Sequence, residues 1–241
     1  MEYALRNRRE AGMSHYTLYI ANRNYSSWSL RPWLLMTELR IPFTETLVPF
    51  EESNHANFSR FSPNARVPCL HDGDTVIWDS LAIIEYLAES HAGVWPQQRV
   101  ARAWARSASA EMHSGFSALR NQCSMNCGLR LQLHALKPDL MADLDRLDAL
   151  WQDGLTRFGG PFLAGSDFSA VDAFYAPVAF RIQSYGLPLS EASLVYAQRL
   201  LALVGMRDWY DKALQEPWRE TGHEREILSQ AVLLADLRNQ P

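Results

Sequence analysis

The chain has little cysteine and no long apolar run, and both absences narrow its class. Its three cysteines are odd in number and irregularly spaced, which does not fit a disulfide-stapled secreted domain. No apolar stretch approaches the ~18 residues that a membrane-spanning helix needs, and the arginine-rich start lacks the apolar block of a secretory signal. We therefore expect a cytoplasmic protein without a membrane partner.

An excess of charge of one sign is also missing. The 23 Lys and Arg against 27 Asp and Glu leave a net charge of −4, which argues against nucleic acid or an anionic membrane as the main partner. The sequence has no Gly-rich phosphate loop and no Gly-x-Ser-x-Gly elbow. Cys123 and Cys127 lie one helical turn apart with His134 downstream, but no second cysteine pair completes a zinc site. We expect no metal.

The composition is that of an ordinary globular protein, 47% hydrophobic over 241 residues. The predicted secondary structure changes near residue 95, from mixed strands and helices to helices alone. Residues 16–92 are predicted to form an α/β domain in the order βαβαββα. The predicted elements are strands at 16–20 and 44–50, a helix at 30–39, a short helix within 52–60, a hairpin around Asp72-Gly73 and a helix from Ser80. A βαβ start implies a parallel strand pair, to which the hairpin adds antiparallel strands. Residues 1–15 are expected to be a flexible extension, or to result from a start upstream of Met13.

Residues 93–241 are predicted to be an all-helical domain. Helices are expected at 97–127, 138–158, 169–185, 191–204 and 206–214, with Gly159-Gly160-Pro161 separating the second from the third. Ser169 and Asp172 form a capping box, in which two side chains satisfy free amides at a helix start reciprocally.

The segment from Tyr25 to Pro32 places hydroxyls where the first strand gives way to the first helix. Ser29 is a suitable N-cap, and Pro32 then falls in the first turn, where a missing N–H is harmless. Ser26 and Ser27 lie beside free amides and the positive end of the helix dipole, which suits an anion such as a thiolate. The alternative is that these serines only cap and turn the chain.

Four motifs, in this order, make residues 16–218 similar to the cytosolic glutathione transferases. They are Ser26-Ser27-Trp28-Ser29-Leu30-Arg31, Val67-Pro68, Asp79-Ser80, and Gly165 followed by Ser169-Ala170-Val171-Asp172. The resemblance implies a thioredoxin-like N-terminal domain, glutathione as co-substrate and a homodimer.

The resemblance also implies which residues bind glutathione. Val67 offers its backbone N–H and C=O to the cysteinyl part, like an added strand, and Pro68, in a cis bond, fixes that edge. Asp79 and Ser80 hold the γ-glutamyl end. His55 is placed to meet the glycyl carboxylate, unless it is simply a solvated histidine.

A hydroxyl that donates to sulfur stabilises the thiolate. The zeta class, which includes maleylacetoacetate isomerases, has a Ser-Ser-Cys-Ser run that resembles residues 26–29. By that match Ser26 activates the thiol and Ser27 supports it, while Tyr25 is the rival because other classes use a tyrosine from this region. Trp28 replaces the zeta cysteine, which disfavours mixed-disulfide chemistry.

We expect the second substrate between the domains, against the first long helix. Met112, His113, Phe116 and Arg120 lie near one face of that helix, although Met112 and Phe116 also fit simple core positions. Arg181 stands about one turn before the place where zeta isomerases carry a dicarboxylate-binding arginine. The predicted activity is transfer of glutathione to a small, hydrophobic electrophile. The alternatives are glutathione-dependent cis–trans isomerisation and a non-catalytic protein that keeps the glutathione cleft.

Overall fold

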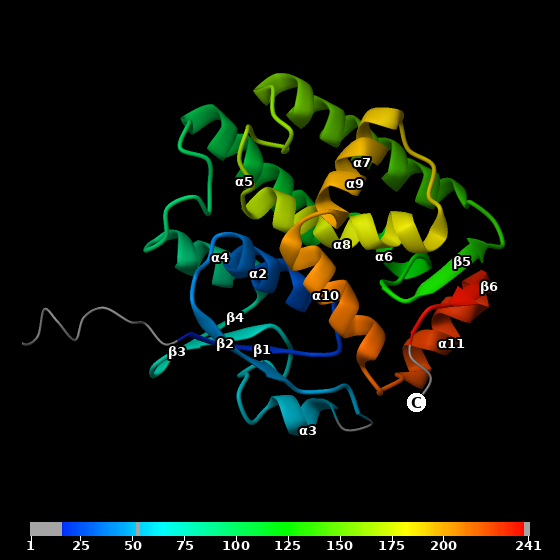
Figure 1. Cartoon of the computed structure of the whole chain (residues 1–241), viewed down its shortest axis with the longest axis horizontal. Coiled ribbons are helices and arrows are strands. Elements are labelled where there is room, and N and C mark those ends of the chain that lie inside the picture. Colours follow the sequence, from blue (N-terminus) through cyan, green and yellow to red (C-terminus); the bar gives the residue numbers. More distant parts are fainter. Residues whose placement is uncertain (1–15, 52–53, 239–241) are drawn as a thin grey trace, which may run out of the picture.

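The computed structural model describes residues 16–51 and 54–238, so the expected extension at 1–15 lies outside the described residues (Figure 1). A small α/β domain packs on a larger helical domain through α2 (Ser27–Glu38) and α8 (Ala170–Tyr185), and one continuous hydrophobic core serves both. Over these ranges no helix is both long and apolar enough to cross a membrane.

The N-terminal domain is built on a four-stranded mixed sheet with the order β2-β1-β3-β4. Its elements are β1 (Tyr16–Ile20), α2, β2 (Phe43–Leu47), α3 (Asn54–Phe58), β3 (Cys69–Asp72), β4 (Thr75–Trp78) and α4 (Ser80–Ala88). β1 pairs parallel with β2 and antiparallel with β3, which pairs antiparallel with β4. Tyr16, Leu18 and Ile20 are buried and alternate with partly exposed residues, as in a half-covered strand. The predicted order βαβαββα is confirmed.

The start of α2 differs from the prediction. The Asn22 carbonyl accepts the N–H groups of Tyr25 and Ser26, and this tight turn lets the helix begin at Ser27, three residues early. Ser26 is therefore the N-cap and Ser29 lies inside the first turn, so the prediction of Ser29 as N-cap was wrong. Pro32 consequently falls in the helix interior, not in its first turn.

The helical domain confirms the predicted class but contains two strands that the sequence analysis did not predict. Its elements are α5 (Arg99–Ser114), α6 (Ser117–Gln122), β5 (Leu129–Leu133), α7 (Pro138–Phe158), α8, α9 (Glu191–Leu201), α10 (Val204–Gln215), α11 (Thr221–Gln230) and β6 (Ala231–Asp236). The expected single helix over 97–127 was wrong, because α5 ends at Ser114. A Cβ on Gly115 would lie 2.8 Å from the Glu111 carbonyl oxygen, and Phe116 follows in the left-handed region at φ 54°.

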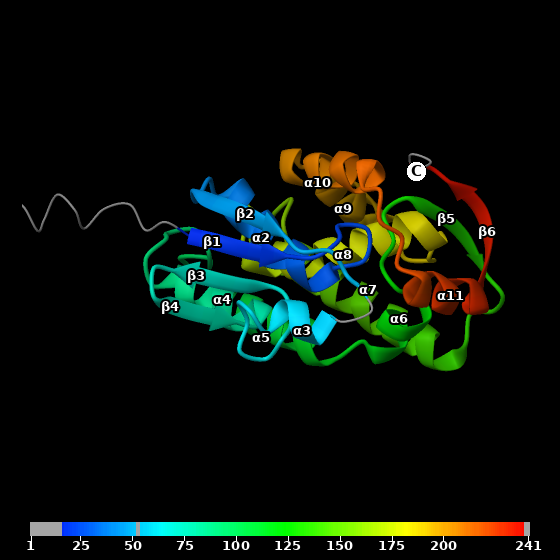
Figure 2. The ribbon, with the colours of Figure 1, turned by 90° about the horizontal axis from the view of Figure 1, so that it is seen from below.

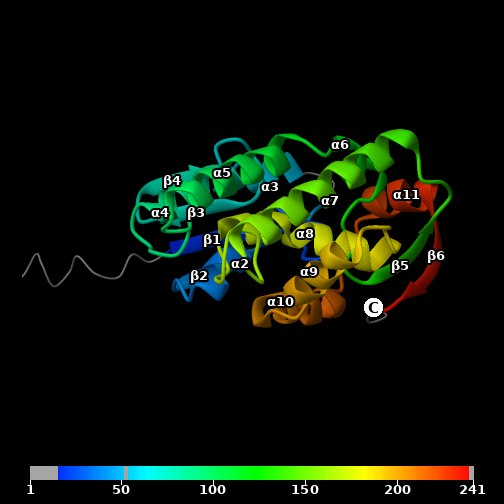
Figure 3. The same cartoon turned by 90° about the horizontal axis from the view of Figure 1, so that it is seen from above.

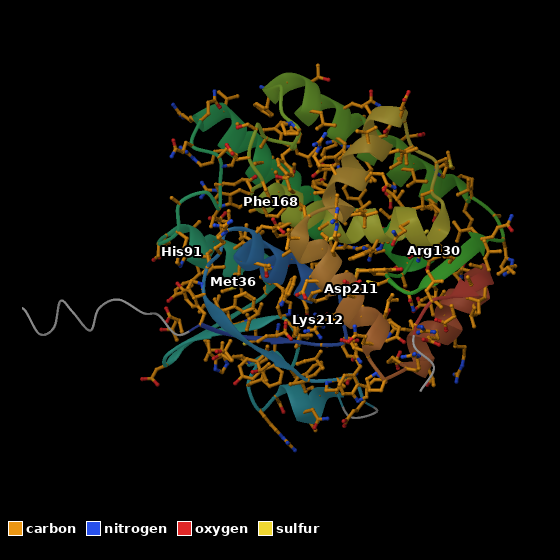
Figure 4. The ribbon with its side chains drawn as sticks, viewed as in Figure 1. Met36, His91, Arg130, Phe168, Asp211 and Lys212 are labelled. Carbon is orange, nitrogen blue, oxygen red and sulfur yellow. The ribbon has the colours of Figure 1, made fainter. Side chains whose placement is uncertain are left out.

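Helix α8 runs through the middle of the helical domain, and every residue from Ala170 to Ile182 is buried (Figure 3). Helix α10 lies between α2 and the β5–β6 sheet (Figure 4). The Lys212 ammonium is 5.8 Å from the centroid of the Trp33 ring on α2, and Arg130 of β5 donates to the Tyr210 hydroxyl at 3.1 Å. Helix α2 of the N-terminal domain is thus packed against both α8 and α10 of the helical domain.

The predicted capping box at the start of α8 is present, with Asp172 fully buried. Its carboxylate accepts the N–H groups of Ser169 (2.9 Å) and Leu163 (3.0 Å) and the Tyr196 hydroxyl (2.7 Å). Burial raises the pKa of Asp172 to about 6, while these donors act in the opposite direction. The carboxylate therefore ties α8, the loop before it and α9 together.

Replacing Asp172 by asparagine is expected to lower the free energy of unfolding by about 3 kcal/mol, because an amide NH₂ would face one of the buried N–H donors. Urea denaturation measures the loss. Asp167→Asn, on the exposed loop just before α8, is the matched control and should change the unfolding free energy by no more than about 0.5 kcal/mol. Equal, small losses in both variants would contradict the structural role of the box.

Candidate functional site

Two adjoining cavities lie between the domains. The first, of about 560 Å³, is lined by the start of α2, Phe50, helix α3, the loop before β3, and residues of α6, α8 and α11. The second, of about 280 Å³, is lined by the cis-proline loop, the start of α4 and the end of α5. Trp28, Arg66 and Val67 line both cavities, so the two form one elongated cleft.

Ser26 and Ser27 line the first cavity and are almost completely buried. Ser26 Oγ lies 2.7 Å from Ser29 Oγ, which in turn accepts the Ala21 N–H at 3.3 Å. No described residue is hydrogen-bonded to the Ser27 hydroxyl. Two hydroxyls thus meet the cavity at the N-terminus of α2, where backbone amides are free to favour an anion.

The Tyr25 hydroxyl is directed to the C-terminal segment instead. It donates to Glu224 at 2.6 Å and accepts from the Glu220 N–H at 3.3 Å and from Arg238 at 3.1 Å. Burial raises the pKa of Tyr25 well above its usual value, and the bond to Glu224 raises it further. Because the Tyr25 hydroxyl already donates its proton to Glu224, it is poorly suited to stabilise a thiolate.

The loop before β3 forms the junction of the two cavities. The Val67-Pro68 peptide bond is cis, as the resemblance implied. Val67 lines both cavities and Pro68 lines the second. This loop therefore lies at the middle of the cleft.

The start of α4 closes the second cavity. Asp79, the N-cap, accepts the Leu81 N–H at 2.8 Å and holds a left-handed backbone conformation with φ 77°. The neighbouring Ser80 hydroxyl is buried and has no partner among the described residues. The second carboxylate oxygen of Asp79 lies 3.4 Å from Nε2 of His113, and both side chains line the cavity.

The residues predicted for the second substrate separate into two groups. Met112 and Phe116 are core residues and line neither cavity, so the structure does not bring them to the cleft. Met112 lies on the buried face of α5, and the break after Ser114 takes Phe116 out of that helix. His113 lies in the second cavity beside Asp79, and burial lowers its pKa while Asp79 raises it. Arg120 lines the first cavity.

Arg181 also lines the first cavity, so side chains from α6 and α8 meet there. His55, in contrast, is exposed on α3 and lines neither cavity, whereas its neighbour Asn54 does. The structure thus does not bring His55 to the cleft.

Two arginines, Arg31 and Arg120, lie over the Trp28 ring, and a third, Arg181, lines the same cavity as Trp28 and Arg120. The guanidinium of Arg31 lies 4.0 Å and that of Arg120 5.5 Å from the centroid of the indole ring, and Arg181 donates to the Cys123 carbonyl at 2.8 Å. Within residues 16–51 and 54–238, no carboxylate pairs with any of the three within 4.0 Å. Nitrogens of Arg31 and Arg181 are buried without partners.

Burial is the main cause that lowers the pKa of Arg31, to about 9, and of Arg181, to about 10, and neighbouring guanidinium groups lower both further. Arg120 and Arg181 therefore bring positive charge to the first cavity, and no carboxylate of the described residues lies within 4.0 Å of either guanidinium. A bound anion would supply the missing partner.

Sequence reasoning missed His223, which lines the first cavity from α11. Its Nδ1 lies 2.6 Å from Glu220 Oε2, and this i, i+3 pair of titratable residues was the only signal in the sequence that could have suggested it. The resemblance ended at Trp218, before this pair. In the part of the chain that the structure describes, no group of three or more His, Cys, Asp or Glu side chains could hold a metal ion.

A mixed βαβαββα domain with a helical domain packed against it, and a cleft between them, is the architecture of the glutathione transferases. Comparison of the sequence with family models also indicates a glutathione transferase. The N-terminal domain of glutathione S-transferases matches residues 25–90 and the C-terminal domain matches residues 131–212, together more than half of the chain. The chain belongs to the glutathione S-transferase family.

The individual relatives share low sequence identity with this chain. A probable maleylacetoacetate isomerase of Caenorhabditis elegans is 27% identical over 179 residues, which is 72% of this chain and 81% of the relative. The glutathione S-transferase GstB of Escherichia coli is 25% identical over 186 residues, 68% of this chain and 83% of the relative. The theta class glutathione S-transferase of Xanthomonas axonopodis pv. citri, solved with glutathione bound, shares the fold with a TM-score of 0.60 at 22% identity, covering 82% of this chain and 98% of that one.

Proposed function

We propose that the protein is a glutathione transferase that activates the thiol of glutathione for attack on a small electrophile. The observation that carries the proposal is the elongated cleft, in which Ser26, Val67 and Asp79 line adjoining cavities with Val67 at the junction. The γ-glutamyl end would lie at Asp79 and Ser80, and the cysteinyl backbone at Val67. The sulfur would then face the serines.

In this mechanism the thiol loses its proton to solvent water, and the sulfur lone pair forms the new bond to the electrophilic carbon. The electron pair of the broken bond leaves with the departing group or, in an addition, moves to the neighbouring atom, which takes up a proton. The hydroxyl of Ser26 and the free amides at the start of α2 stabilise the thiolate that attacks. The protein itself supplies only positioning and electrostatic stabilisation.

Calorimetry with glutathione, combined with ultraviolet titration of the bound thiolate, tests this function. We expect binding below millimolar concentration and a thiol pKa below that of free glutathione, because the cleft stabilises the anion. Absence of binding would overturn the proposal. Binding without a lowered thiol pKa and without turnover on any electrophile would instead favour the non-catalytic alternative.

A second candidate is glutathione-dependent cis–trans isomerisation of an acid. The unpaired guanidinium groups of Arg120 and Arg181 in the first cavity support a carboxylated substrate, and a relative bears the name of such an isomerase. In this reaction the thiolate adds to a double bond, the adduct rotates about the resulting single bond, and the thiolate leaves again. Both candidates use the same thiolate and differ in the fate of the adduct.

We also propose a homodimer that acts in the cytoplasm. The exposed apolar side chains of Trp78 on β4 and Val100 on α5 support a further interface, since large apolar groups at a surface favour burial. Light scattering is expected to give about twice the chain mass. A monomer mass at micromolar concentration would contradict the dimer without affecting the proposed chemistry.

A further inference from the structure

The C-terminal segment, residues 216–238, forms a strap that lies beyond the stretch matched by the family models. Its helix α11 and strand β6 lie at the end of the sheet toward which β1 runs (Figure 2). β6 pairs antiparallel with β5, with Ala231 opposite Leu133 and Asp236 opposite Leu129. The strap therefore has a defined position against both domains.

Buried polar contacts anchor both ends of the strap to the N-terminal domain. Glu216 accepts the Arg23 N–H at 3.0 Å and its guanidinium at 3.2 Å. Arg238 forms an ion pair with Glu224 and donates to Tyr25, and Gly128 provides the space for it, because a Cβ there would collide with the Arg238 side chain. The helix between these anchors is held over the first cavity.

His223 is the strap residue that lines this cavity. Its ring centroid lies 5.5 Å from that of Tyr25 and 5.6 Å from that of Phe50, and about two fifths of its side chain is exposed. Because the Glu220 carboxylate can only accept, Nδ1 donates its proton there. Nε2, which no described residue bonds, can then donate to a ligand when the ring is the doubly protonated imidazolium. A histidine whose ring is fixed on two aromatic neighbours is pre-organised to bind.

The course of glutathione through the cleft indicates which group His223 would meet. With the γ-glutamyl end at Asp79 and the cysteinyl backbone paired with Val67, the extended tripeptide continues past Arg66 and Ala65, toward α3. Phe50, Asn54 and His223 line the first cavity, with the rings of Phe50 and His223 in contact. On this course the terminal carboxylate would come to lie against these three residues.

We propose that the imidazolium form of His223 binds the glycyl carboxylate of glutathione by donating its Nε2–H, the role that the sequence analysis gave to His55. The inference rests on the proposed function, since it requires that glutathione occupies the cleft. It makes the strap a part of the co-substrate site, although the strap lies outside both family domains.

The test compares glutathione with γ-glutamylcysteine, which lacks the glycyl residue, by calorimetry. His223→Phe keeps the ring packing and removes the nitrogens. It is expected to weaken glutathione binding about tenfold, the effect of losing one charge-assisted hydrogen bond. Its affinity for γ-glutamylcysteine should change less than twofold, so that the two dissociation constants converge. His55→Phe is the matched control and should change neither.

Other outcomes would overturn the proposal. If His223→Phe weakens the binding of both ligands equally, the residue only shapes the cavity. If only His55→Phe lowers the affinity for glutathione, His55 on α3 binds the glycyl carboxylate. Urea unfolding of each variant shows whether the strap remains folded, and His223→Gln, which keeps a donor, should lie between wild type and His223→Phe. If the wild-type protein binds neither ligand, the proposed function itself fails, and this inference with it.

Discussion

Replacing Ser26 by alanine is expected to raise the pKa of the glutathione thiol in the complex by one to two units and to reduce turnover roughly hundredfold. A free thiol of this kind has a pKa of about 8.5, and a hydrogen bond to a charged group is worth about 1.5–3 kcal/mol, which corresponds to one to two pKa units. Without the donor, less thiolate forms at neutral pH and its developing contacts are lost. Ultraviolet titration of the bound thiolate and steady-state turnover measure the two effects.

The contact between Ser26 and Ser29 provides a sharper version of this test. The Ser26 hydroxyl donates to Ser29 Oγ at 2.7 Å, and Ser29 Oγ also accepts the Ala21 N–H at 3.3 Å. Ser26 can therefore donate to the sulfur only when its hydroxyl turns away from Ser29. Ser29→Ala removes the competing acceptor and is expected to lower the thiol pKa, in the direction opposite to Ser26→Ala.

Two further variants serve as controls. Tyr25→Phe should leave the thiol pKa unchanged, since its hydroxyl is bonded to Glu224 and Arg238 in the strap. Ser27→Ala should have less effect than Ser26→Ala. If Ser27→Ala removes the thiolate while the Ser26 and Ser29 variants keep it, Ser27 is the donor and the proposed mechanism is wrong on this point.

The second large effect is expected from Arg181→Met with a carboxylated electrophile. The substitution keeps the length of an apolar chain and removes a buried guanidinium that has an unpartnered nitrogen and no carboxylate within 4.0 Å in the described chain. Loss of a charge-assisted contact should raise the KM for an electrophile that carries a carboxylate roughly ten- to hundredfold. The KM for a neutral aryl halide should change by less than about threefold, because that substrate has no charge to bind.

Arg207→Met, on the exposed face of α10, is the matched control and should alter neither KM. The stability of Arg181→Met should change little, since removing a buried unpaired charge offsets the lost bond to the Cys123 carbonyl. Equal KM changes for charged and neutral electrophiles would indicate a packing effect and would remove the support for an acidic substrate. A selective change would favour the isomerase-like candidate over transfer to a purely hydrophobic electrophile.

The parts of the cleft that sequence reasoning located are those with local signals. A hairpin turn at Asp72-Gly73, a proline after Val67 and an acid-serine pair at a helix start depend on residues adjacent in the chain, and each lies where it was predicted. The helix over 138–158 was predicted with its bounds, because Pro138 and Gly159 mark its ends. The single helix over 97–127 failed because the helical spacing of apolar residues continues across Gly115, although the backbone does not.

The sequence by itself determined the class of this protein: the order of its elements, its family and the loops that line the cleft follow from turn, cap and strand signals only a few residues long. Only the tertiary structure decided what surrounds the start of α2. It bonds the Tyr25 hydroxyl to the strap, places Met112 and Phe116 in the core, brings Arg120 and Arg181 to the first cavity, and places His223 in the cleft while His55 faces solvent. These outcomes depend on contacts between residues up to about 200 positions apart, such as Tyr25 with Glu224, which no local pattern encodes because they form only when the two domains and the strap pack together.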